Sequence, residues 1–338
     1  MYYEKAISFK ELYRGLRLSA RNVKWKDSVA IYYANGLKHT YRLRQNLLNG
    51  RYKIDQYQRF MIYEPKVREI VATRIKDRQF QRALTDNVLY PQITHGFIRD
   101  NIACQKGKGV DDALNRMDAH LHRYYRKHGC EGWVLKCDIR HYFAETRHDV
   151  AKAAIRKRVT DDEAYARAAE IIDSFGGDKG IGLGSQVSQL VELAVLDDFD
   201  HWIKERLRVK HYIRYMDDFV LIHEEKDFLR HALKLIADKL SALGLTLNDK
   251  TNIYPLRQGV KFLKWRFVLT ASGRVLRRMS RKAVTKEKRK LRRMARKGAS
   301  EKAMRESLDS WIANARRGDT YGVVIDMERY FEEVCKHG

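Results

Sequence analysis

Apolar residues in the central part of the chain follow two different spacings, one typical of strands and one typical of helices. A short apolar stretch from Trp133 to Leu135 predicts a strand that runs into Asp138. Helical sequence follows this strand and is broken by a glycine-rich loop at 174–185. The pattern then predicts a helix at 186–207 and a strand–turn–strand around 215–218. Last come a helix at 227–243, which ends at Gly244, and a strand at 245–249.

This order of elements predicts an α+β fold built on a split βαβ, ferredoxin-like sheet. In that topology the first and third strands are central neighbours and run antiparallel. The end of the first strand, which carries Asp138, should therefore lie beside the start of the third strand, which carries Asp217 and Asp218. Carboxylates about eighty residues apart in the sequence are expected to meet at one edge of the sheet.

Composition narrows the class of protein that could use such an edge. The chain has 338 residues, 44% hydrophobic content and a formal net charge of +25, which favours a folded protein that binds polyanions. No apolar run approaches the ~18–20 residues needed to cross a bilayer, and the N-terminus lacks a secretion signal. We expect a cytoplasmic protein that binds nucleic acid and not membrane. The four cysteines lack the spacing of a zinc site and are expected to be free thiols.

The sequence Tyr-Met-Asp-Asp at 215–218 has two interpretations. Asp is a favoured turn residue, so the pair could simply be the polar tip of a hairpin. Clustered carboxylates, however, repel one another unless a cation compensates, and their hard oxygens suit Mg²⁺. Two such ions can activate a hydroxyl and stabilise a leaving oxygen in phosphoryl transfer. Together with the basic charge, this predicts metal-dependent nucleotidyl transfer at Asp138, Asp217 and Asp218.

These residues resemble the catalytic motifs of reverse transcriptases. The sequences CDIRHYF around Asp138 and YMDD match their two acidic motifs, while residues 60–84 resemble their fingers and 259–267 their primer grip. The resemblance implies a right-hand polymerase with a ferredoxin-like palm sheet, helical fingers and a basic helical thumb. The expected segments are an N-terminal basic helical extension at 1–59, fingers at 60–130, a palm at 131–256 with finger helices inserted around 150–178, and a primer grip and thumb at 257–338.

One loop resembles a narrower group. Leu183, Gly184 and Gln189 lie in LGSQVSQ, which is similar to the aliphatic-Gly-x-x-x-Ser-Gln pattern of diversity-generating retroelement reverse transcriptases. That group copies a template RNA into cDNA with frequent errors opposite adenine, and a compact chain without an appended endonuclease or maturase region fits it. The resemblance implies dNTPs, template RNA, an RNA/DNA duplex and a small basic accessory protein as partners. One alternative is a phage-defence reverse transcriptase, of the abortive-infection or retron-like kind, that makes DNA from its own noncoding RNA or without a template. The others are a catalytically silent RNA-binding scaffold and a maturase-like splicing factor.

The resemblance also implies roles near the acidic residues. Asp138, Asp217, Asp218 and the Ile139 carbonyl would hold two Mg²⁺ ions, with Mn²⁺ as a possible substitute, although Asp218 could orient the site instead of binding. Phe143 stands five residues after Asp138, where the family places an aromatic gate against ribonucleotides. The alternative for Phe143 is an ordinary core residue. Its neighbour Tyr142 is expected to line the sugar pocket.

Several basic residues are candidates for binding the incoming nucleotide. Lys66 and Arg68 alternate in a predicted fingers strand, so they would share one face and could clamp the triphosphate, or could form a solvated basic surface. Lys250 could act as a general acid toward pyrophosphate or be an ordinary exposed lysine. Gly184 would let the backbone approach the base pair, and Leu183 cannot hydrogen-bond to it. We therefore expect this loop to relax base selection.

The most basic stretch, residues 274–297, carries thirteen Lys and Arg residues against one Glu. Following the primer-grip sequence, it predicts a thumb helix that tracks the nucleic-acid backbone, although such runs are often solvated or disordered. At the other end of the chain, Ser8 and Glu11 form a capping-box pattern. The residues expected to contact template and primer are Arg78, Tyr215, Met216, Arg277, Arg278, Lys282, Lys286, Lys290 and Arg293.

Overall fold

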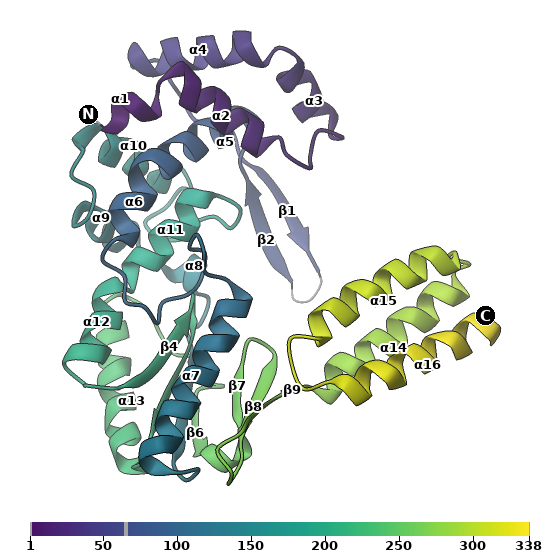
Figure 1. Ribbon diagram of the computed structural model, residues 1–338. Helices are drawn as coiled ribbons and strands as arrows, with labels where there is room; N and C mark the ends of the chain where they lie inside the picture. Colours follow the sequence, from purple (N-terminus) through teal and green to yellow (C-terminus); the bar gives the residue numbers. More distant parts are fainter. Residues whose placement is uncertain (1, 64–66, 338) are drawn as a thin grey trace. The chain divides into compact units, whose positions relative to one another are not determined.

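The computed structural model describes residues 2–63 and 67–337, and the chain divides into two compact units (Figure 1). The first unit comprises Met1–Gln105, Ile139–Arg208 and Leu235–Asn248. The second comprises Lys106–Asp138, Val209–Lys234 and Asp249–Gly338. Each unit is assembled from three separate stretches of chain and so does not correspond to one of the expected segments. The segment boundaries expected at 59, 130 and 256 therefore stay predictions.

The first unit is mainly helical. Its α2 helix begins after Ser8, whose Oγ accepts the Glu11 N–H at 3.4 Å, as the capping pattern predicts. Helix α2 packs on α5, where Gln79 Nε2 donates to the Leu12 carbonyl at 3.1 Å. The elements are α1 Tyr2–Ala6, α2 Phe9–Ser19, α3 Asp27–Ala34, α4 Gly36–Leu48, α5 Ile75–Leu84, a π-helical turn Thr85–Leu89, α6 Tyr90–Thr94, α8 Tyr142–Glu145, α9 His148–Arg156, α10 Asp162–Asp173, α11 Gln186–Val195, α12 Asp197–Glu205, and the antiparallel strands β1 Gln58–Ile62 and β2 Arg68–Ala72.

The second unit contains the four-stranded sheet that the sequence predicts. Its order is β4-β5-β3-β6, so the first strand of the pattern, β3, and the third, β5, are antiparallel central neighbours. Apolar side chains of β3 and β5, such as Val134, Leu135 and Leu221, are fully buried. Rings of helix α7 pack against β4 through Tyr124 and His211. The elements are α7 Val110–His128, β3 Trp133–Asp138, β4 His211–Tyr215, β5 Asp218–His223, β6 Asn252–Pro255 and α13 Lys226–Ser241, whose last turns belong to the first unit.

Two predicted elements differ from the structure. The single helix expected at 186–207 is two helices, because Leu196 leaves helical geometry (φ −99°, ψ 12°) and three aspartates begin α12, where a helix dipole favours negative charge. The strand expected at 245–249 makes only an isolated bridge, between Leu247 and Ile139. The fourth strand of the sheet is Asn252–Pro255, which pairs with β3.

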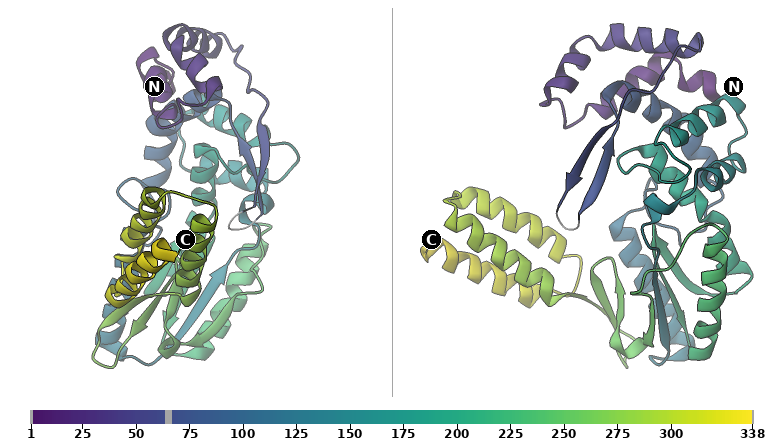
Figure 2. Two further views of the ribbon diagram at one scale, coloured as in Figure 1. Left: turned by 90° about the vertical axis from the view of Figure 1, so that its right-hand side faces the viewer. Right: turned by 180° about the vertical axis from the view of Figure 1, so that it is seen from behind.

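A second sheet and three helices complete the second unit. Strands β7 Val260–Phe262, β8 Trp265–Leu269 and β9 Val275–Met279 form an antiparallel sheet, with a 3₁₀ turn at Leu256–Gln258 before it. Helices α14 Arg281–Arg296, α15 Glu301–Ala315 and α16 Tyr321–His337 lie side by side in every view (Figure 2). They share a core that includes Leu291, Leu308 and Met327.

The basic stretch 274–297 is therefore only partly helical. Its first residues form β9, which pairs with β8, and Ser280 then caps α14 by accepting the Ala283 N–H at 3.3 Å. Within residues 2–63 and 67–337, none of the helices is both long enough and apolar enough to cross a membrane.

Candidate active site

The acidic residues lie where two central strands meet. Asp138 ends β3 and Asp218 begins β5, and the two are direct cross-strand partners. Tyr215 pairs with Asp218 across the β4–β5 hairpin, so Met216 and Asp217 form its two-residue turn. The strand register thus brings together two carboxylates that lie about eighty residues apart in the sequence, as the strand order predicts.

The turn has an unusual backbone. Met216 has φ 58°, in the left-handed region that costs a non-glycine residue roughly 1–2 kcal/mol. The fully buried Arg214 holds the turn, because its Nη1 donates to the Met216 carbonyl at 3.0 Å. Arg214 was not predicted from the sequence, although an arginine within an apolar strand was a visible signal. Tyr215, Met216 and Asp217 are partly exposed at this turn.

Lys136 is a second residue of the edge that was not predicted from the sequence. Its Nζ donates to both carboxylate oxygens of Asp218, at 3.0 and 3.1 Å, and to the Lys261 carbonyl of β7 at 2.9 Å. These three bonds use all three donors of the ammonium group. The alternation of β3 places Lys136 two residues before Asp138, on the same face, which was the available signal. Lys136 thus joins the acidic edge to the β7–β8 hairpin.

Electrostatics make this edge suitable for a cation. Burial raises the pKa of the Asp218 carboxyl, Lys136 opposes that rise, and the negative charge of Asp138 adds to it. Burial likewise raises the pKa of the thiol of Cys137, the fully buried residue between Lys136 and Asp138. The groups at the edge that could bind a metal ion are carboxylate oxygens, the ligand type that Mg²⁺ prefers, and the Lys136 ammonium lies beside them.

The described residues contain no group of three His, Cys, Asp or Glu side chains arranged to hold a metal ion. A Mg²⁺ site in enzymes that act on phosphates needs only one or two carboxylates, because substrate phosphates and water supply the other ligands. The pair formed by Asp138 and Asp218, with Asp217 next to it in the turn, fits that donor set. Ile139, whose carbonyl is the further expected ligand, is a buried residue that is 1% exposed.

The loop expected over the base pair lies in the first unit and contacts β2. The Leu183 carbonyl accepts the Val71 N–H at 3.0 Å. Gly184 has φ +128°, and an added Cβ would lie 3.0 Å from the Val71 carbonyl oxygen, so both backbone shape and space favour glycine there. Leu183 is partly exposed, while Gly184 and Gln189 are exposed. The loop is thus a supported backbone turn that presents one aliphatic side chain.

Tyr142 and Phe143 differ in their surroundings. Tyr142 is 3% exposed, and its hydroxyl donates to the Glu192 carbonyl at 2.6 Å. The phenol is thus held in place by burial and a hydrogen bond, and its expected position in a sugar pocket stays a prediction. Phe143 is partly exposed in α8, and its carbonyl accepts the Ile181 N–H at 2.7 Å.

The basic residues predicted in the fingers have different outcomes. Lys66 lies outside the described residues, and Arg68 is exposed at the start of β2. Arg78 is partly buried, and its Nη2 donates to the Thr73 carbonyl at 3.0 Å, so its contacts are structural. Burial lowers the pKa of the Arg78 guanidinium. Lys250, which belongs to the second unit, is exposed.

The C-terminal basic residues separate into two groups. Lys282, Lys286, Lys290 and Arg293 recur every three or four residues and lie on one face of α14, with Arg278 exposed on β9. Arg277 differs from these residues in its contacts. Its guanidinium pairs with Asp118 at 2.5 Å and donates to Asn115 at 2.6 Å, and its side chain is only 17% exposed. It links β9 to α7, and its expected contact with template and primer stays a prediction.

Comparisons with known proteins point to one family. The model of the family "Reverse transcriptase (RNA-dependent DNA polymerase)" matches residues 63–267. Protein YkfC of Escherichia coli (strain K12) is 24% identical over 274 residues, which cover 67% of this chain and 70% of that protein.

Solved structures show a similar fold. Truncated apo telomerase from Candida tropicalis has a TM-score of 0.50 at 12% identity, covering 66% of this chain and 55% of that one. Telomerase from Candida albicans, solved with a fragment of telomeric RNA, has a TM-score of 0.51 at 10% identity, covering 77% of this chain and 55% of that one. This chain thus spans about half the length of these telomerase chains, and the likeness concerns the fold alone.

The chain is therefore a nucleotidyltransferase with a polymerase-like fold and an acidic edge on its central sheet. It belongs to the reverse transcriptase family, the RNA-directed DNA polymerases, because the family match covers more than half of its residues.

Proposed function

We propose that the chain copies an RNA template into error-prone cDNA, as the reverse transcriptase of a diversity-generating retroelement. The observation that carries the catalytic part is the cross-strand pair of Asp138 and Asp218 beside the Asp217 turn. The LGSQVSQ loop supports the subtype. Template RNA, an RNA/DNA duplex, dNTPs and a small basic accessory protein are the proposed partners.

Each proposed role follows from a residue's chemistry. Asp138, Asp217 and Asp218 would hold two Mg²⁺ ions, or Mn²⁺ in their place, with the Ile139 carbonyl as a further ligand. When bound, the ions would lower the pKa of the primer 3′-hydroxyl and neutralise charge on the leaving pyrophosphate. Arg68 and Lys66 would orient the triphosphate, Arg68 through its planar fork and Lys66 as a point charge. Lys250 would donate a proton to the pyrophosphate.

The exposed basic face of α14 would hold the duplex. Lys282, Lys286 and Arg293 contact no base in this proposal, because phosphate contacts fix position without reading sequence. Binding should therefore weaken as salt rises, whatever the sequence of the duplex.

Primer extension tests the proposal. The full chain would be given a DNA primer on an RNA template or on a DNA template of the same sequence, with dNTPs and Mg²⁺, and the products would be sequenced. Full-length complementary DNA on RNA, with errors concentrated opposite adenine, is expected. Products that ignore the template would instead favour the defence-type alternative. Failure to extend any primer, with duplex binding intact, would favour a silent scaffold.

Leu183→Gln is expected to lower misincorporation opposite adenine by about tenfold. A pocket that relies on apolar shape discriminates weakly, whereas a polar group that must be satisfied rejects wrong partners more strongly. Sequencing of primer-extension products measures the change. Leu37→Gln is the matched control, because Leu37 is 60% exposed on α4 and should leave the error rate unaltered. An unchanged error rate in Leu183→Gln would remove this role for the loop.

Lys136→Met is expected to reduce the rate of extension at saturating Mg²⁺ about tenfold and to lower the half-saturating Mg²⁺ concentration several-fold. The ammonium group orients Asp218 through two bonds, and its positive charge opposes a nearby divalent cation. A Mg²⁺ titration of primer extension measures both quantities.

Two further variants separate positioning from folding. Lys136→Arg keeps the charge and should recover the Mg²⁺ dependence. Lys152→Met removes a lysine that pairs with Asp173 on the surface of the first unit and should change neither quantity. A slower Lys136→Met enzyme whose Mg²⁺ dependence is unaltered would mean that Lys136 only supports the sheet.

A further inference from the structure

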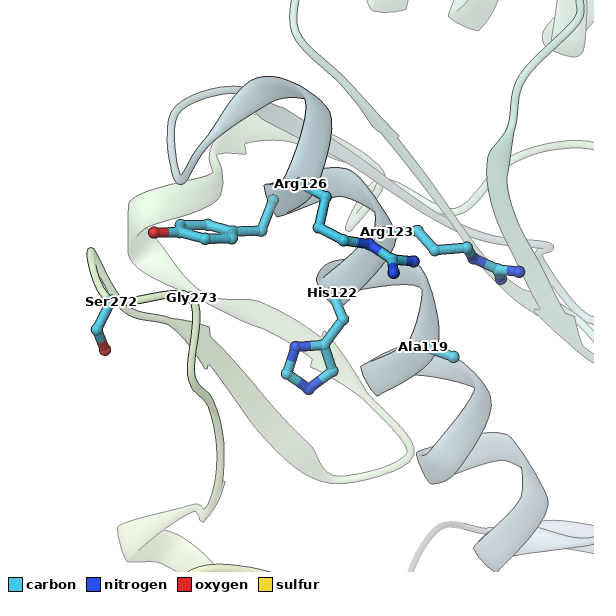
Figure 3. A pocket seen from close by; sticks show the side chains of 7 residues that line it. Ala119, His122, Arg123, Arg126, Ser272 and Gly273 are labelled. Carbon is cyan, nitrogen blue, oxygen red and sulfur yellow. The ribbon is translucent and has the colours of Figure 1, made fainter.

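A basic hollow lies in the second unit between α7 and the turn that joins β8 to β9. It measures about 510 Å³ and is lined by Ala119, His122, Arg123, Tyr125, Arg126, Ser272 and Gly273. Ala119, His122, Arg123 and Arg126 follow helical spacing, so they share one side of α7. Figure 3 shows these side chains on successive turns of the helix, with the Ser272–Gly273 turn across from them.

The wall of this hollow is fixed by specific contacts. The Tyr125 hydroxyl donates to the Ala271 carbonyl at 2.7 Å. Gly273 has φ +81°, and a Cβ there would lie 2.5 Å from the Tyr125 ring, so the turn sits directly on the tyrosine. On the neighbouring strand, Arg277 binds Asp118 of α7. The β8–β9 turn is thus held against the helix, and the hollow between them is a built feature of the unit.

The lining is cationic. None of the seven lining residues is acidic, and three of them are arginine or histidine. Arg126 is exposed and has neither an ion-pair nor a hydrogen-bond partner among the described residues, while Arg123 contacts only the ring of His120, at 3.5 Å. Guanidinium groups present a planar fork that matches phosphate oxygens. The hollow therefore suits a phosphate chain.

The hollow is distinct from the acidic edge. Tyr124, next to its lining residues, binds the Glu131 carbonyl just before β3 begins. The seven lining residues include none of Asp138, Asp217, Asp218 or Lys136, so the hollow and the acidic edge share no side chain.

We propose that this hollow binds the phosphodiester backbone of RNA outside the template–primer duplex, with Arg123 and Arg126 as its main contacts. RNA is favoured over an acidic protein because the chain belongs to a family that copies RNA, and the planar forks of Arg123 and Arg126 match phosphate oxygens. The proposal rests on the proposed function only in taking the ligand to be the RNA that the enzyme copies. The hollow would hold that RNA while the template–primer duplex occupies the acidic edge.

The test compares two probes with the full chain in the absence of dNTPs. One probe is a short RNA/DNA duplex with a brief template overhang. The other is the same duplex with a long single-stranded RNA extension on its template strand. Fluorescence anisotropy gives the Kd for each probe over a range of salt concentrations.

The double variant Arg123→Glu with Arg126→Glu is expected to raise the Kd for the extended probe about tenfold or more. Its salt slope should fall by roughly 1.4, because each phosphate contact on a single strand contributes about 0.7. The Kd for the short duplex should stay within about twofold. The milder pair Arg123→Gln with Arg126→Gln should show the same pattern with a smaller change, which guards against a folding defect in the charge reversal.

The matched control is Lys234→Glu with Lys239→Glu, two exposed residues of α13 that make the same change in net charge. It should leave the difference between the probes as in the wild type. The proposal would be overturned if affinity fell equally for both probes, or if the control variant lost as much affinity for the extended probe. It would also be overturned if affinity for the extended probe did not fall, and that result would point to an acidic protein as the ligand. Wild-type primer extension on the short duplex separately tests the proposed function.

Discussion

Asp217→Asn is expected to reduce RNA-templated primer extension by at least about a thousandfold while leaving duplex binding within about twofold. The substitution keeps the size of the side chain and removes one negative charge from the turn between β4 and β5. Stabilisation of transition-state charge by a bound metal ion contributes several kcal/mol, and each 1.4 kcal/mol changes the rate tenfold. Single-turnover extension and a separate Kd measurement give the two quantities.

The control for this loss is Asp227→Asn, which makes the same change at a side chain that is 88% exposed in α13. It should extend primers at the wild-type rate. Asp138→Asn should behave like Asp217→Asn, because Asp138 is paired across the strands with Asp218 at the same edge. More than about a tenth of wild-type activity in Asp217→Asn would show that this carboxylate is not essential to the reaction.

Phe143→Val is expected to lower the preference for dNTPs over rNTPs by about 10- to 100-fold, with the kcat/KM for dNTPs changed only several-fold. An aromatic ring at this place would exclude the ribose 2′-hydroxyl by contact, and a smaller side chain would admit it. Discrimination of this size is typical of a steric difference of a few atoms. Phe143 is partly exposed, and its ring packs edge-on against Tyr142 with centroids 6.1 Å apart.

A matched control separates gating from a general loss of packing. Phe9→Val removes a ring that is 37% exposed in α2, and it should leave the ratio of rNTP to dNTP use unchanged. If Phe143→Val kept the wild-type preference and only lowered the melting temperature, Phe143 would be an ordinary core residue.

The strand order of the central sheet and the meeting of Asp138 with Asp218 could be predicted from the sequence. The order of strands and helices restricts the topology to few choices, and that topology fixes which strand ends are neighbours. Exact boundaries could not be predicted in the same way. Residues 245–249 alternate like a strand, yet the ladder with β3 is formed by Asn252–Pro255, because tertiary pairing decides which extended stretch is used.

Side-chain partners were the other limit of the sequence. Arg277 looked like one of many basic residues in 274–297, but Asp118 and Asn115, more than 150 positions earlier, bind its guanidinium. Likewise, the bond from Lys136 to the Lys261 carbonyl depends on how β3 and β7 lie in the fold. Local pattern contains no information about such partners, and so it could not separate structural cations from those available to nucleic acid.

The most direct test of a shared metal site at the acidic edge is cleavage of the chain by bound Fe²⁺. The protein would be incubated with Fe²⁺ in place of Mg²⁺, together with template–primer and dNTP, then exposed to ascorbate and peroxide, and its fragments mapped. Cuts close to residues 138–139 and 216–218 are expected, with both sets lost together in Asp138→Asn. Cuts elsewhere in the chain, or cuts near 216–218 that persist unchanged in Asp138→Asn, would contradict a metal site shared by these carboxylates.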